Sequence, residues 1–333
     1  MNALKAIILA GGLTVILLLG VATFNYNIDP MCFYQCEKVE LGKTTLNTYY
    51  QVAQKIFAHP KAEIVILGSS RGQTTPPLWI EKETGHQTLN LSMGGAELSA
   101  KMAFLNIAIE QTKVKKVLWF ADYFELLSEL ADVKIKSTPA LRSYLATDQD
   151  HSKLSHILSD IIGLIDHNTL EASFYSLEHS SQSQLDQGTG SGLDFDRCQS
   201  ENYQGEKSNR EMEKEIGFSY DTYSRKILRP EQSKKAWIQF VNKLEFLNSK
   251  NIDVVIIIPP YNPIFSSRLA NQYPEIFARH RKWIDDLKNL KISRIKVVDY
   301  FNSIPNDDGT PRYWNDGVHF TCRGAIEMLK HEI

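Results

Sequence analysis

Short apolar runs separated by helical patterns recur along this chain and limit the folds that it can adopt. Helical patterns cover Leu98–Ile109, Ser233–Asn248 and Glu275–Leu290, between or before these runs. The runs have the length of strands and are Ile64–Leu67, Thr88–Leu91, Val117–Ala121, Val254–Ile258 and Ile295–Val298. Continuous apolar strands that alternate with helices are typical of a parallel sheet buried on both faces. The sequence therefore predicts a three-layer α/β/α fold around a mainly parallel, flavodoxin-like sheet.

The N-terminus carries an uncharged stretch from Ala6 to Phe24. Its length approaches the ~20 apolar residues with which a helix crosses a bilayer. Lys5 precedes the stretch and the next charge is Asp29, so the positive-inside rule places the short N-terminus in the cytoplasm. The small residues Gly20–Ala22 leave a cleaved signal peptide as the alternative. We expect a single-pass anchor through residues 6–24, with the rest of the chain outside the cytoplasm.

The remaining chain is expected to form one large domain over residues 31–333, after an anchor and linker over 1–30. A helical pattern covers Leu41–Phe57, ahead of the first strand. The strand–helix rhythm is lost in the middle, which predicts an inserted cap or loop region at about 123–230. Within it, His151–Leu170 is helical in pattern, and Ser180–Arg210 is rich in polar residues and typical of a long surface excursion.

Four cysteines are present, Cys32, Cys36, Cys198 and Cys322. An even number in an exported chain indicates disulfides, and the sequence leaves all three pairings open. Cys32 and Cys36 are near enough to close a small loop beside the membrane. A metal site is the weaker alternative, because no second Cys or His pair stands at matching spacing, and free buried thiols are a further one.

The charges exclude one class of function. The formal net charge is −2 and the basic residues are scattered along the chain. A nucleic-acid-binding surface needs a basic patch, so we expect no nucleic acid partner.

Polar residues follow the predicted strands at the edge where ligands bind in such sheets. Ser70 comes after the first strand, and Asp316 and His319 stand near the C-terminus. A serine becomes nucleophilic when a histidine takes its proton and a carboxylate orients that histidine. The amides of Ser70 and Gly95 are candidate donors for an oxyanion hole. These residues together predict nucleophilic catalysis by Ser70.

The order of these motifs resembles the SGNH, or GDSL-like, hydrolase superfamily. Gly68-Ser69-Ser70 stands in the place of its first block, with Ser69 at the usual Asp position. Asn90, Ser92 and Gly95 match the second block, and Asp316 and His319 match the last. The third block departs from the pattern, because Asp122 stands where the family places an oxyanion-hole Asn.

The resemblance extends to membrane-anchored members that have an Asn-x-Asp-Pro segment after the anchor, here Asn27–Pro30. Such proteins are accessory factors of cell-envelope acylation, including lipoteichoic-acid D-alanylation, and often partner membrane-bound O-acyltransferases. The resemblance implies a site in the bacterial plasma membrane that faces outward. It also implies an acylated glycan or acyl donor as ligand, with no metal and no cofactor.

Other polar or aromatic side chains are candidates for substrate binding, each with a structural alternative. Arg71 either binds a substrate anion or forms a structural ion pair. Asp122 either belongs to the site or caps a helix, and the cap is favoured. Trp314 either stacks on a sugar or packs in the core. Asn90 is a candidate through the second block, and Pro259–Asn262 follows the fourth strand at the same edge.

The predicted function is an extracytoplasmic serine esterase or acyltransferase that acts on acyl esters of an envelope polysaccharide. One alternative is a non-catalytic protein of the same fold that binds glycan or serves as a scaffold for an O-acyltransferase. Another is a structural membrane partner that acts through the polar insert.

Overall fold

The computed structural model describes residues 3–36, 39, 41, 45–126, 135, 138, 141, 144, 161–178, 207–227, 233–302, 304, 307 and 309–333. The chain divides into two compact units. The first comprises residues 1–58 and 132–188, and the second comprises 59–131 and 189–333.

The second unit contains a five-stranded parallel sheet in the order β2-β1-β3-β4-β5. Its strands are β1 (Ile64–Leu67), β2 (Thr88–Asn90), β3 (Lys116–Phe120), β4 (Asp253–Ile258) and β5 (Ile295–Asp299). Val117 pairs with Val65 of β1 and with Val254 of β4, which places β3 at the centre of the sheet. The predicted α/β class and flavodoxin-like strand order are confirmed.

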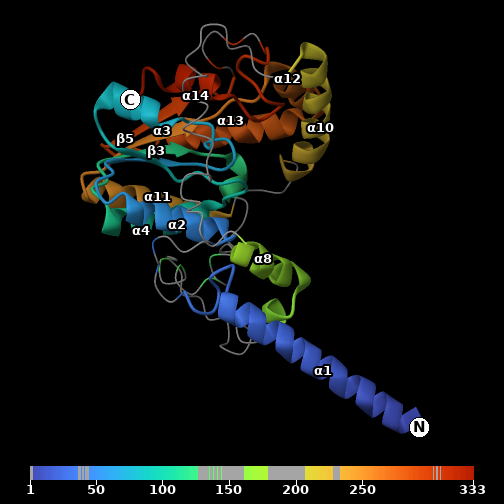
Figure 1. The fold of residues 1–333 in the computed structure, drawn as a ribbon. Coiled ribbons are helices and arrows are strands. Elements are labelled where there is room, and N and C mark those ends of the chain that lie inside the picture. The colour runs from blue at the N-terminus through green and yellow to red at the C-terminus, as the bar shows by residue number, and fades with distance from the viewer. Residues whose placement is uncertain are drawn as a thin grey trace. The chain divides into compact units, whose positions relative to one another are not determined.

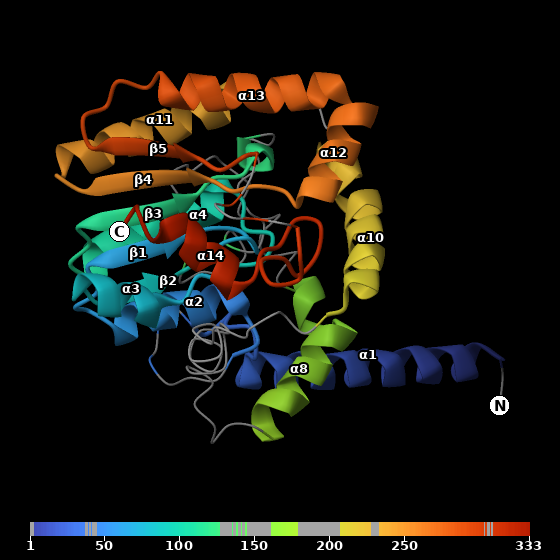
Figure 2. The ribbon, with the colours of Figure 1, turned by 90° about the horizontal axis from the view of Figure 1, so that it is seen from above.

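Helices cover this sheet on both faces (Figures 1 and 2). On one face α4 and α11 pack together, against β1 and β4 respectively, whereas α3 and α14 lie on the other face and α13 packs beside the edge strand β5. Their bounds are α3 (Pro77–Thr84), α4 (Leu98–Gln111), α11 (Lys234–Ser249), α13 (Pro274–Lys288) and α14 (Cys322–Leu329). The shorter η1 (Tyr123–Leu126) follows β3, and α10 (Asn209–Ile227) packs against η1 and against α12 (Pro263–Gln272).

The first unit is built from α1 (Ala3–Ile28), α2 (Thr48–Ala58) and α8 (His167–Glu178). Within the described residues, α1 is the one helix that is long and apolar enough to span a membrane, over Ile7–Ile28. The helix predicted from Leu41 begins later, at Thr48. The Asn47 side chain accepts hydrogen bonds from the backbone N–H groups of Tyr49 and Tyr50 (3.1 and 3.3 Å) and so marks the start of α2.

The predicted insert is described only in part. Residues 151–160 of the predicted helix His151–Leu170 and residues 180–206 of the polar segment lie outside the described residues. The later part of that region forms α8, whose helix continues to Glu178. The expected cap over the sheet therefore stays a prediction.

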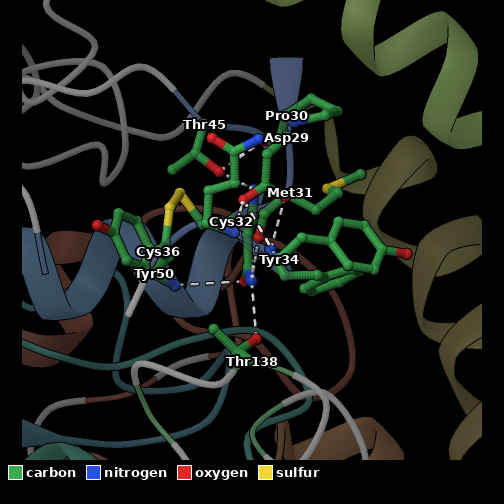
Figure 3. The surroundings of a disulfide bond; sticks show 12 residues. Asp29, Pro30, Met31, Cys32, Tyr34, Cys36, Thr45, Tyr50 and Thr138 are labelled. Carbon is green, nitrogen blue, oxygen red and sulfur yellow. Dashed lines mark hydrogen bonds between the residues drawn. A yellow bond between two sulfur atoms is a disulfide. The ribbon is translucent and has the colours of Figure 1, made fainter. Parts of the chain in front are cut away.

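A disulfide closes a short loop at the C-terminal end of α1 (Figure 3). It joins Cys32 to Cys36, both fully buried beside Tyr50. The Asp29 carboxylate accepts the backbone N–H groups of Phe33 (2.8 Å) and Gln35 (2.9 Å), which orders the loop. Among the described residues, Asp29 and these two cysteines are the one cluster with metal-ligand spacing, but the disulfide leaves no thiolate to bind a metal.

The pairing Cys32–Cys36 is thus one of those that the sequence left open. Cys322 is also disulfide-bonded, and the described part of the chain contains no free cysteine. Cys198 lies outside the described residues.

Candidate active site

The loop after β1 is a tight turn that presents two adjacent serines. The Gly72 N–H donates to the Ser69 carbonyl at 3.1 Å. A Cβ on Gly68 would lie 2.9 Å from the Gly72 Cα and 2.8 Å from the Ser92 Oγ, so the close backbone approach requires glycine. The turn leaves the Ser69 side chain buried and the Ser70 side chain partly exposed.

Ser70 meets the residues that the sequence predicts as its partners. Its Oγ lies 2.7 Å from His319 Nε2, across a sequence separation of 249 residues. On the other side of the ring, His319 Nδ1 lies 2.7 Å from Asp316 Oδ2. The second oxygen of Asp316 accepts the backbone N–H groups of Val318 (2.7 Å) and His319 (2.8 Å). Each residue of the triad is partly exposed, so the hydroxyl is within reach of a ligand.

The carboxylate of Asp316 determines which ring nitrogen carries the proton. Burial raises the pKa of Asp316, but the His319 hydrogen bond and charge and the two backbone N–H donors outweigh it and hold the pKa below 3.8. An ionised carboxylate only accepts, so the Nδ1 of His319 carries the proton. Nε2 is then left to accept the Ser70 hydroxyl proton, which is the arrangement of a general base.

The loop that carries Asp316 and His319 is wedged between helices of the same unit. A Cβ on Gly317 would lie 2.7 Å from the Phe265 ring of α12 and 3.1 Å from the Ser219 Cβ of α10. The Gly317 carbonyl accepts the Asn262 N–H at 3.0 Å. A larger residue at this position would have to move the Phe265 ring, so the close packing at Gly317 restricts where the loop and His319 can lie.

Ser69 belongs to a different network, which is buried. Its Oγ donates to Asp122 Oδ2 at 2.6 Å, and Arg71 Nη1 pairs with Asp122 Oδ1 at 2.9 Å. Arg71 also donates to the Pro260 carbonyl and stacks over the Tyr261 ring, 4.7 Å from its centre. The exposed fractions of Ser69 and Asp122 are 1% and 2%, and that of Arg71 is 6%. Asp122 directly precedes η1, and its backbone carbonyl accepts the Glu125 N–H at 3.1 Å, while its carboxylate oxygens bind Ser69 and Arg71.

A second ion pair lies behind Asp122. Glu125 Oε1 accepts the Asp122 N–H at 2.9 Å and pairs with Lys101, whose Nζ also donates to the Phe120 carbonyl at 2.7 Å. Burial raises the pKa of Glu125 to about 7, against the attraction of Lys101. Our sequence interpretation did not include this pair. The available signal was the single lysine inside the otherwise apolar pattern Leu98–Ile109.

The two remaining substrate-binding candidates are also buried and engaged inside the protein. Asn90 Nδ2 donates to the carbonyls of Gly72 and Thr75 (2.9 Å each), and its Oδ1 accepts the Ser92 N–H (2.9 Å). The Trp314 Nε1–H donates to the Asp307 carboxylate at 2.9 Å, and 1% of Trp314 is exposed. Asn90 therefore braces the turn after β1, and Trp314 is a core residue next to the triad loop.

The predicted oxyanion donors are backbone N–H groups of Ser70 and Gly95. Gly95 is exposed and has a φ of +71°, a conformation that favours glycine. Within the described chain, neither N–H group has an acceptor. Asp122, at the place of the missing Asn, is a carboxylate that binds Ser69 and Arg71, and the oxyanion hole formed by the Ser70 and Gly95 amides stays a prediction.

By sequence, no protein family and no curated protein matches this chain. A comparison with solved structures matches this chain to one from Streptococcus pneumoniae, described as a "putative platelet activating factor". It is 11% identical with a TM-score of 0.37, over 86% of this chain and 92% of that chain. Another is a "putative acylhydrolase" from Bacteroides fragilis, 12% identical with a TM-score of 0.36, over 84% and 92%. Because both TM-scores lie below 0.5, the functional inference depends on the geometry of the site.

Proposed function

We propose that this chain is a serine esterase or O-acyltransferase of the SGNH type, which acts on ester-linked acyl groups of a cell-envelope polysaccharide. The observation that supports the proposal is the unbroken series of hydrogen bonds from Ser70 Oγ through His319 to Asp316, with 2.7 Å at each step. An isolated serine at a turn needs no such partners, whereas a nucleophile requires both.

In the proposed reaction, His319 Nε2 takes the Ser70 proton as Oγ attacks the acyl carbonyl carbon. Asp316 stabilises the imidazolium that forms, and the amides of Ser70 and Gly95 donate to the developing oxyanion. The bond to the alcohol then breaks, and His319 returns the proton to the departing oxygen. An acyl-Ser70 ester remains, and no metal or cofactor takes part.

The acyl group leaves Ser70 by the same proton transfers in reverse order. Water or a glycan hydroxyl gives its proton to His319 and attacks acyl-Ser70, after which Ser70 regains the proton. We favour transfer to a polysaccharide, because a helix of α1's length and apolarity keeps the site near membrane-bound assembly. In this proposal α1 anchors the chain in a bacterial plasma membrane with the catalytic unit outside, beside a membrane-bound O-acyltransferase.

A non-catalytic glycan-binding or scaffolding function is the alternative, and one observation favours it. Asp122 replaces a donor of the oxyanion hole and is used up by Ser69 and Arg71. Loss of one oxyanion donor lowers kcat by about 10²–10³-fold in serine enzymes. A site that lacks this oxyanion-hole donor catalyses the reaction slowly or not at all.

Covalent labelling separates the two functions. We expect a fluorophosphonate to label the wild-type chain on Ser70, located by peptide mass, and to leave Ser70→Ala unlabelled. Ser69→Ala is the matched control, since it removes the neighbouring hydroxyl from the same turn and should keep the label. An unlabelled wild-type chain that is folded by circular dichroism would end the enzyme proposal.

A further inference from the structure

The helix α8 has an unusual distribution of side chains for a protein surface in water. Its buried residues are small or polar, namely Thr169, Ala172, Ser173 and Ser176. Phe174 and Leu177 face outward, with exposed fractions of 55% and 48%, and Leu170 is half-buried. Water-exposed helices show the opposite pattern, with apolar residues toward the protein.

The small face of α8 packs against the C-terminal end of α1 within the first unit (Figures 1 and 2). The buried Asn25 of α1 accepts from the Ser173 hydroxyl and donates to the Leu164 carbonyl, both at 2.8 Å. The rings of Phe24 and Phe174 lie 5.1 Å apart. Small residues at the contact and side-chain hydrogen bonds between helices are the means by which helices pack in lipid.

The outward side of α8 is divided into an apolar and a polar stripe. Leu170, Phe174 and Leu177 follow the spacing i, i+4, i+7, and so form one stripe along the helix. His167, Glu171 and Glu178 form the next stripe round the helix. The preceding segment adds Ile161, Ile162 and Ile165, which are 52%, 65% and 40% exposed. Such a helix suits a boundary between apolar and aqueous surroundings.

We propose that α8 is an interfacial helix, which lies in the outer leaflet boundary of the bilayer that α1 spans. The apolar stripe contacts acyl chains and the polar stripe faces water. The surface is continuous with α1, because Phe174 adjoins Phe24 at the end of the uncharged stretch. At 1.5 Å per residue, the 12 residues of α8 reach only about 18 Å, too short to cross a core of about 30 Å.

This inference depends on α1 being a membrane span and not on the proposed catalysis. A second contact with lipid through α8 would restrict how far the first unit can tilt relative to the membrane. A tyrosine pair beside it, Tyr26 and Tyr34 with rings 6.0 Å apart, supplies the aromatic residues that are enriched at this depth.

Tryptophan fluorescence in vesicles tests the proposal on the full chain. Phe174→Trp, Leu177→Trp and the polar-stripe control Glu171→Trp are reconstituted in phosphatidylcholine and phosphatidylglycerol vesicles, with or without bromine on the acyl chains. The native tryptophans, of which there are five, all belong to the second unit and provide the baseline. We expect bromine to remove most of the added emission at 174 and 177 and little of it at 171.

Two outcomes would overturn the proposal. Unquenched emission at both apolar positions means that α8 lies in water or waits for a protein partner, which these vesicles lack. Equal quenching at 171 means that α8 is embedded rather than interfacial. If Phe174→Trp fails to fold, Leu177→Trp alone tests the proposal, because residue 177 is not the ring that packs against Phe24. Fluorophosphonate labelling of the same samples reports separately on the catalytic proposal.

Discussion

Two neighbouring serines in one turn have opposite surroundings. Ser70 lies beside an imidazole nitrogen at a partly exposed site, whereas Ser69 donates to a carboxylate in a buried ion-pair network. The imidazole nitrogen has a lone pair that can accept the Ser70 proton, whereas the Asp122 carboxylate is held in an ion pair with Arg71. The tertiary partner, and not the residue type or the local turn, therefore assigns a role to each hydroxyl.

The largest expected effect separates the two serines directly. Ser70→Ala should reduce kcat for an activated acyl ester on the order of 10⁶-fold, as for a lost nucleophile in serine hydrolases. Ser69→Ala should keep most activity and reduce the free energy of unfolding by about 1–3 kcal/mol, since Asp122 loses a donor. Ester hydrolysis and urea unfolding in detergent micelles measure the two. Loss of activity in Ser69→Ala, with activity kept in Ser70→Ala, would show that Ser69 and not Ser70 is the nucleophile.

The next largest effect concerns only the partly exposed triad of Ser70, His319 and Asp316. Asp316→Asn should lower kcat by about 10⁴-fold, because an amide can hold the imidazole in the wrong tautomer. The fold should remain, as judged by circular dichroism. Asp307→Asn is the matched control, since this carboxylate accepts from Trp314 outside the triad and an amide oxygen can still accept. Equal losses in both variants would mean that Asp316 acts only through folding.

A smaller effect is expected when the buried ion pair between Arg71 and Asp122 is broken. Arg71→Met leaves the Asp122 carboxylate buried without its partner, which should cost about 3–5 kcal/mol of unfolding free energy. Combining it with Asp122→Asn should restore part of that loss, because the uncompensated charge is gone. A double-mutant cycle from urea unfolding measures the coupling. Additive losses would show that Arg71 and Asp122 contribute independently.

The smallest expected effect is a pH dependence of the unfolding free energy, which comes from the buried His280 side chain. Burial, with a contribution from Arg71, lowers the pKa of His280 from 6.5 to about 3. Between these values the unfolded chain binds the proton and the folded chain does not, so acidification below pH 6.5 destabilises the fold. The slope from this group is about 1.4 kcal/mol per pH unit. Relative to wild type, His280→Gln should therefore lose less stability between pH 6 and pH 4.

The control for that measurement is His331→Gln, which changes an exposed histidine. Its stability should follow the wild-type curve in thermal or urea unfolding across the same pH range. Parallel curves for His280→Gln and wild type would contradict a neutral, buried His280.

The sequence was most informative where local pattern and burial agree. The predicted runs Ile64–Leu67 and Val254–Ile258 differ from the observed β1 and β4 by at most one residue at either end. Asp316 and His319 were readable as a pair because their spacing places both on one loop. The start of α2 was harder to predict, because the apolar spacing continues back to Leu41. The helix begins only at Thr48, where the Asn47 side chain caps it.

The roles of Asp122 and Asn90 depended on partners in other segments of the chain, and that of Trp314 on a loop contact with Asp307. Asp122 meets Arg71 across 51 residues, and Asn90 meets the Gly72 carbonyl across 18. Each residue has a side chain that suits ligand binding as well as internal bracing. Only the folded arrangement shows that their polar atoms are already bonded.

Hydrophobic periodicity and composition alone specified the parallel sheet and an apolar N-terminal helix, because burial of apolar side chains follows the repeat of each element. The meeting of Ser70 with His319 could be anticipated from motif order, but not its 2.7 Å separation. Which serine faces the base, and which polar groups are sealed in the core, was decided by tertiary packing. Hydrogen bonds depend on distances of tenths of an ångström, and these are set only when separate strands and loops are brought to the same edge.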